Sequence, residues 1–162
     1  MRRVYLLPAL TVLLIAACSP TSNNEDAVTA TTSKDISLDA KTDTGRWYSR
    51  TQVNEGKQMY AQFCAACHGP EAASTPQWRK PDDNGNYPPP PLNGTAHAWH
   101  HPLSVLDMVI RDGGQPLGGV MPAWGSMLSF EQRMSIIASF QNYWSDDIYD
   151  LWLEREKSSR EQ

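Results

Sequence analysis

The residues with the clearest chemistry are two cysteines and a histidine in the stretch FCAACHG, residues 63–69. Cys64 and Cys67 are three positions apart, and His68 follows directly. About one helical turn separates the two thiols, and this spacing suits their addition across the two vinyl groups on one edge of a haem. The imidazole of His68 can then reach the iron from one face. The motif therefore predicts one haem c, bound covalently through Cys64 and Cys67.

Three other uses of these cysteines need different surroundings. A redox-active dithiol of the thioredoxin type follows a strand and begins a helix, but no strand pattern precedes Cys64. A zinc site could combine both cysteines with His97 and His101, whose spacing zinc sites permit. A disulfide between Cys64 and Cys67 would close a very short loop and stabilise the fold little. The zinc site is the strongest of these alternatives.

A haem iron that transfers electrons usually has a second protein ligand, and methionines and histidines follow the motif. Met121 lies in the sequence GGVMPAWG, where Pro122 fixes the backbone beside it. We therefore expect His68 and Met121 to bind the iron, with Met127 or a downstream histidine as alternatives. Three more methionines lie on expected helix faces, where they would fill the core: Met59, Met108 and Met134.

Three histidines in one loop have no assigned role. His97, His100 and His101 precede an expected helix within the sequence HAWHHP. Histidines in loops are mostly exposed. Each of the three could instead contact a haem propionate or cap a helix, and the sequence does not decide between these roles.

Helices are expected on both sides of the motif. A first helix begins near Thr51 and runs into the motif, and Gly56 within it indicates a close approach by another helix. A second helix occupies residues 103–112. A third begins at Ser129, with Gln132 completing a capping box, and runs to residue 144. No β-pattern of any length is present, so the predicted fold class is all-α.

An irregular stretch separates the motif from the second helix. Residues 69–100 contain four consecutive prolines, Pro88 to Pro91, which neither a helix nor a central strand accommodates. A loop this long is unusual in a compact domain unless it is functional. A loop wrapped around a bound cofactor would explain its length.

The N-terminus reads as an export signal. Arg2 and Arg3 precede an apolar run over residues 4–17, which is shorter than the roughly 20 residues that a spanning helix needs. The sequence LIAAC, which ends at Cys18, resembles the lipobox of bacterial lipoproteins. That resemblance implies removal of residues 1–17 and acylation of Cys18, which would give the third cysteine its role as a lipid anchor.

Two appendages flank the expected domain over residues 46–144. Residues 18–45 are rich in Thr, Ser, Asp and Ala and have no apolar periodicity, so we predict an acylated, disordered tether. A flexible chain of roughly 27 residues has an r.m.s. span of about 30 Å. The tail over residues 145–162 carries Ile148, Leu151 and Trp152, which could form one short helical face for docking.

The order of these features resembles class I c-type cytochromes, the small monohaem electron carriers of bacterial respiratory chains. The resemblance covers roughly residues 46–144 and implies a small helical domain wrapped around one haem. It also implies that the first and last helices cross at a contact of Gly56 and Tyr60 with Phe140 and Tyr143. The tail after residue 144 departs from the pattern of a minimal family member.

The same resemblance assigns three further residues to the haem. A loop proline in the family offers its carbonyl to the N–H of the proximal histidine, and here Pro91 is assigned this role, with Pro90 as the alternative. Leu92 would then pack on the haem face. Trp99 would pack against the haem edge or bond a propionate.

Composition and resemblance together predict an electron carrier, not an enzyme. The 162 residues carry a formal net charge of −4 without a basic stripe, which argues against nucleic-acid binding. Loss of Arg2 and Arg3 with the signal would make this charge −6, and an acidic surface favours basic redox partners of the respiratory chain. No small-molecule substrate is expected, because two axial ligands leave the iron no open position.

The predicted location is a membrane surface that faces the periplasm. Ser19 follows Cys18, where the familiar retention signal for the inner membrane is an aspartate, so the resemblance favours the outer membrane. The alternative function is an electron-entry cytochrome subunit of a membrane-associated oxidoreductase or oxidase. A peroxidase would need an open iron face, and a sensor would need an output module, for which the sequence shows no pattern.

Overall fold

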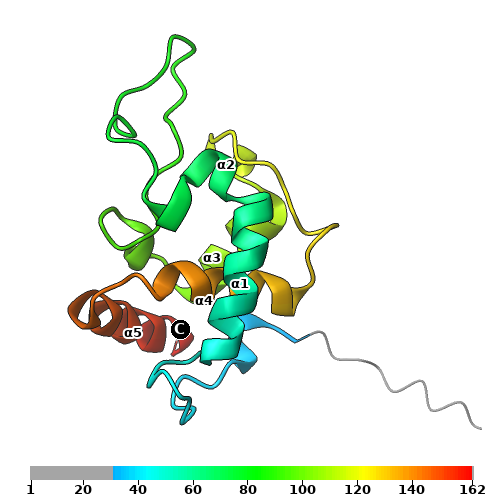
Figure 1. The fold of residues 1–162 in the computed structure, drawn as a ribbon, viewed down its shortest axis with the longest axis vertical. Coiled ribbons are helices and arrows are strands. Elements are labelled where there is room, and N and C mark those ends of the chain that lie inside the picture. Colours follow the sequence, from blue (N-terminus) through cyan, green and yellow to red (C-terminus); the bar gives the residue numbers. More distant parts are fainter. Residues whose placement is uncertain (1–30, 162) are drawn as a thin grey trace, which may run out of the picture.

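The computed structural model describes residues 31–161, and all regular structure in that range is helical (Figure 1). This confirms the all-α prediction. The α-helices of the described range are α1 (Arg50–Phe63), α2 (Ala65–His68), α3 (Leu103–Asp112), α4 (Phe130–Gln141) and α5 (Asp146–Arg160). Short 3-10 helices lie in the connecting segments: η1 (Ser33–Asp35), η2 (Pro70–Ala72), η3 (Ala98–His100) and η4 (Gln115–Leu117).

Both long helices of the core begin at a serine capping box. The Ser129 hydroxyl accepts from the Gln132 amide, and the Gln132 side chain accepts from the Ser129 amide, as predicted for α4. The cap of α1 is Ser49, paired in the same way with Gln52, and not the expected Thr51. The Ser49 hydroxyl accepts from the free amide of Gln52 in the first turn, so the helix begins before Thr51, which lies within that turn.

The main packing contact joins α1 to α4, which cross at the centre of the molecule (Figure 1). Gly56 of α1 lies directly against the backbone of Ser135, and a methyl group at Gly56 would come 2.9 Å from the Cβ of Ser139. The crossing at Gly56 is therefore confirmed, and the atoms nearest to Gly56 belong to two small residues, Ser135 and Ser139. Small residues on both helices are what allow the backbones to approach so closely.

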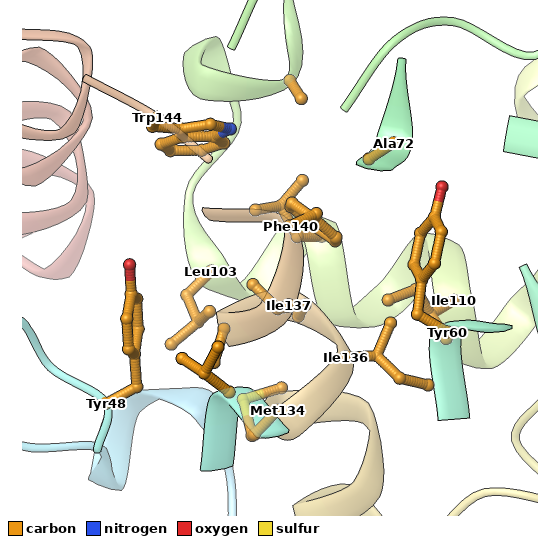
Figure 2. Packing of buried hydrophobic residues seen from close by; sticks show 14 of the residues in the cluster. Tyr48, Tyr60, Ala72, Leu103, Ile110, Met134, Ile136, Ile137, Phe140 and Trp144 are labelled. Carbon is orange, nitrogen blue, oxygen red and sulfur yellow. The ribbon is translucent and has the colours of Figure 1, made fainter. Parts of the chain in front are cut away.

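A core of apolar side chains surrounds this crossing (Figure 2). Met134, Ile136 and Ile137 of α4 are almost completely buried, and they pack with Leu103 of α3 and Tyr48, which precedes α1. An ion pair lies beside this core, where Arg133 of α4 donates to Asp107 of α3 at 2.6 Å. These contacts hold α3 and α4 in a fixed relative position.

The C-terminal tail is an integral part of the fold. Residues Asp146–Arg160 form α5, whose Trp152 is fully buried and whose Tyr149 is 4% exposed. The expected docking face is wrong in detail, because Trp152 faces the core while Leu151 is 45% exposed. Leu151 therefore lies at the solvent edge of the face that Trp152 buries. The compact domain therefore extends beyond the predicted boundary at residue 144.

The described part of the expected tether also contacts the domain. Arg160 of α5 donates to the backbone carbonyls of Ser33, Lys34 and Ile36, at 3.0, 3.2 and 2.8 Å respectively. Residues 33–36 are thus held against α5, which corrects the prediction of a disordered tether for this segment. The predicted signal peptide, Cys18 and the first part of the tether lie outside the described residues. Within residues 31–161, no helix combines the length and apolar character needed to cross a membrane.

Candidate haem site

A cavity of about 510 Å³ lies between α2, α3 and the loops that follow them. Its walls are mostly apolar, and this size and character are typical of sites that bind an organic cofactor. The helices contribute Phe63, Cys64, Cys67, His68, Val105, Leu106, Val109 and Ile110 to the lining. The loops contribute Trp78, Tyr87, Pro88, Pro89, Pro90, Leu92, His97, Ala98, His101, Leu117, Gly119, Val120, Met121, Pro122 and Trp124.

The three motif residues line this cavity together. Cys64 ends α1 and begins the short helix α2, so Cys67 and His68 follow within one helical turn. Both cysteines are free thiols; Cys64 is buried and Cys67 is exposed. Burial, with a smaller contribution from Cys67, raises the pKa of the Cys64 thiol to about 11. Both thiols therefore border the same apolar cavity.

The orientation of the His68 ring is set by a backbone carbonyl. Its Nδ1–H donates to the carbonyl oxygen of Pro90 at 3.0 Å, which leaves the lone pair on Nε2 for a metal. Burial lowers the pKa of His68, which favours the neutral imidazole that metals bind. The assignment of this role to Pro91 is wrong. Pro91 is buried outside the cavity lining, one residue beyond the carbonyl that reaches His68.

Three contacts anchor the proline-rich loop. The Leu92 amide donates to the Ala72 carbonyl at 2.8 Å, and the Ser74 hydroxyl donates to the Pro89 carbonyl. The indole of Trp144 donates to the Leu92 carbonyl at 2.7 Å. Because both of its backbone polar groups are bonded, Leu92 is fixed at the cavity wall, the position that the resemblance implied for it.

Met121 also lines the cavity and is held from the end of α3. The Met121 carbonyl accepts from the Gly114 amide at 2.9 Å. A Cβ atom at Gly113 would lie 2.7 Å from that same carbonyl oxygen, so a glycine is needed there. Further along the loop, the Trp124 amide donates to the Ile110 carbonyl at 3.0 Å. The Met121 side chain is thereby presented to the cavity, where it can act as a soft ligand for iron.

The competing methionines lie elsewhere. Met127 is 62% exposed and does not line the cavity. Met134 is buried in the core, where the sequence pattern placed it. Among the methionines of the described residues, Met121 is the one that borders the cavity.

Trp99 does not contact the cavity, contrary to the expectation for it. It stacks on His100 with ring centroids 3.7 Å apart, and the Arg155 guanidinium of α5 lies 5.4 Å from its ring. The reason is the 3-10 helix η3, which repeats every three residues. Ala98 and His101 therefore share the face that lines the cavity, and Trp99 points away from it.

Several lining residues were not identified from the sequence. Trp78 and Tyr87 come from the irregular loop, where no periodicity marks an inward position. Val105 and Val109 lie beside Leu106 and Ile110, so α3 is apolar over a wider arc than a helix with one buried face. This width was a signal in the sequence that α3 buries a second face, against a cofactor.

The alternative uses of the cysteines lack their required surroundings. Residues 31–161 contain no strand, so the context of a thioredoxin-type dithiol is not present there. In the same range, no three His, Cys, Asp or Glu side chains approach closely enough to hold a metal ion. The zinc site built from Cys64, Cys67, His97 and His101 is therefore not formed. His97 and His101 instead lie close to each other in the cavity wall, with ring centroids 5.8 Å apart.

Comparison with protein families agrees with this geometry. A family model described as cytochrome c oxidase, cbb3-type, subunit III matches residues 51–138, more than half of the chain. The chain belongs to this family and carries a c-type cytochrome domain, whose function is haem-based electron transfer. No curated protein and no solved structure gave a significant match.

Proposed function

We propose that the protein is a lipid-anchored, periplasmic monohaem cytochrome of class I that carries electrons between respiratory partners. The observation that carries the proposal is that one apolar cavity is lined by Cys64, Cys67, His68 and Met121. The two thiols would hold one haem covalently. A haem iron supplies one-electron Fe(II)/Fe(III) chemistry when bound, and a thioether ligand favours the reduced state.

The residues of the chain then have separate roles. The Pro90 carbonyl holds the proton on His68 Nδ1 and fixes the ring, while the Gly113–Gly114 turn presents Met121. The valines and leucines of the cavity exclude water, which limits rearrangement around the iron as its charge changes. No group in this set is needed to break or form a bond in a substrate, so we assign the protein as a carrier.

The Met121 assignment is tested by Met121→Ala, with Met127→Ala as the matched control on the same loop. Purified protein should first show haem c in a pyridine haemochrome spectrum. Met121→Ala should abolish the red sulfur-to-iron band and allow the reduced protein to bind carbon monoxide, whereas Met127→Ala should do neither. A band that survives Met121→Ala would show that another residue is the ligand.

The lipid anchor is a separate part of the proposal and rests on the LIAAC sequence before Cys18. Replacement of Cys18 by alanine should move the exported protein from the membrane fraction to the soluble periplasm. Unchanged membrane attachment would contradict acylation. Ser33 lies 15 positions after Cys18, and a chain of this length spans at most about 50 Å, so the anchor would keep the domain close to the bilayer.

The family match favours a second candidate, an electron-entry subunit of a membrane-associated oxidase. The matched family is described as a subunit, and the exposed apolar side chains of Leu117 and Val120 beside the cavity suit a partner surface. Gentle solubilisation followed by size-exclusion chromatography separates the two candidates. A lone monomer supports the carrier, and stoichiometric copurification with oxidase subunits supports the second candidate.

A further inference from the structure

Helix α5 lies outside the matched residues 51–138, yet it holds a corner of the haem cavity. The corner is the segment 101–103, which joins the cavity residue His101 to the first residue of α3. The buried indole of Trp152 donates to the His101 carbonyl at 3.1 Å. The carboxylate of Glu156 accepts from the Leu103 amide at 2.6 Å. Both contacts come from one face of α5.

The Glu156 contact replaces a missing helix cap. The N-cap residue of α3 is Pro102, which has no side-chain acceptor for the free amides of the first turn. The Glu156 carboxylate takes this place from another helix, and its negative charge is favourable at a helix N-terminus. Glu156 is 3% exposed, and its second oxygen accepts from the Arg160 guanidinium at 2.7 Å, which balances the buried charge.

The far end of α3 holds the Met121 loop. The carbonyl of Ile110 accepts from Trp124, and the amide of Gly114 donates to Met121. A helix of ten residues is about 15 Å long and moves as a rigid body. A displacement at Leu103 is therefore transmitted to the loop that presents Met121.

We propose that Glu156 is a positioning residue for the iron ligand Met121, acting through α3. This inference rests on the proposed haem function and adds a role for the C-terminal helix in it. With Glu156 in place, the N-terminus of α3 is anchored and the Met121 loop stays closed over the cavity. Without it, the N-terminus of α3 is free to shift, the shift reaches the Met121 loop through the helix, and Met121 leaves the iron more often.

The experiment compares Glu156→Ala and Glu156→Gln with the control Glu154→Gln, an exposed position on the same helix. Each haem-loaded protein is measured for the sulfur-to-iron band, for carbon monoxide binding in the reduced state, and for thermal unfolding. Glu156→Ala should weaken the band and raise the carbon monoxide binding constant about tenfold, equivalent to about 1.4 kcal/mol. Glu156→Gln keeps one acceptor for Leu103 and should fall between alanine and wild type.

The outcomes are distinguishable. If Glu156→Ala unfolds at a lower temperature but matches Glu154→Gln in its band and in carbon monoxide binding, Glu156 is merely structural and the inference fails. If Glu156→Ala does not fold, Glu156→Gln decides by the same two measurements. A wild-type protein without haem overturns the proposed function as well, whereas haem-loaded variants identical to wild type overturn this inference alone.

Discussion

The crossing of α1 and α4 makes Gly56 the most sensitive position of the scaffold, and Gly56→Ala tests this. On an exposed helix face, the change would stabilise the protein by about 1 kcal/mol, because alanine has the higher helix propensity. At Gly56, the added methyl would overlap the backbone carbonyl of Ser135 and lie 2.9 Å from the Cβ of Ser139. Carbon atoms normally pack at about 3.5–4.0 Å, so the helices must move apart.

The expected magnitude follows from these two opposed terms. Overpacking of a core destabilises by about 1–3 kcal/mol, and the upper end applies because the obstacle is backbone and cannot rotate away. Subtraction of the propensity gain leaves a net loss of about 2 kcal/mol in the free energy of unfolding. For a domain of this size, that loss corresponds to a fall in Tm of about 8 °C.

The assay is thermal and urea unfolding of haem-loaded protein, followed by far-ultraviolet circular dichroism. Ala61→Gly, at an exposed position of the same helix, is the control and should lose about 1 kcal/mol from propensity alone. Because α1 ends at the haem motif, Gly56→Ala should also lower the yield of haem-loaded protein. A Gly56→Ala protein at least as stable as wild type would refute the close crossing.

Three further predictions concern contacts around the core. Asp107→Ala leaves the buried guanidinium of Arg133 without its partner and should lower the free energy of unfolding by about 3–5 kcal/mol in urea titrations. Arg160→Ala removes the donor that holds residues 33–36, so hydrogen exchange of these amides should accelerate while exchange in the core stays slow. Burial raises the pKa of Tyr149 to about 12, so its contribution to stability is present below about pH 10 and lost as the pH rises to about 12. Across that pH range, Tyr149→Phe should lose about 2 kcal/mol less of its free energy of unfolding than wild type does.

Each of these has a clear contrary result. A loss below about 1 kcal/mol in Asp107→Ala would show that the ion pair is solvated. Equal exchange at residues 33–36 in Arg160→Ala and wild type would remove the argument that α5 holds this segment. Identical alkaline unfolding curves for Tyr149→Phe and wild type would show that the phenol ionises freely in the folded protein.

The local features of this protein were determined by the sequence alone. The spacing of Cys64, Cys67 and His68 predicts haem attachment because it follows from one helical turn and needs no distant contact. Ser129 and Gln132 mark the start of α4 for the same reason, since a capping box involves four consecutive residues. The absence of any β-pattern was sufficient for the all-α class.

Only the tertiary structure decided which residues meet across the fold. The family resemblance placed Pro91, with Pro90 as the alternative, and Trp99 at the haem, but the acceptor for His68 is Pro90, and η3 turns Trp99 toward α5. Composition indicated a disordered tether up to residue 45, but Arg160 holds part of it at carbonyls more than 120 residues earlier. Such contacts depend on the packing of whole helices, and no local pattern specifies them. The same holds for Glu156, which caps a helix that begins 53 residues before it.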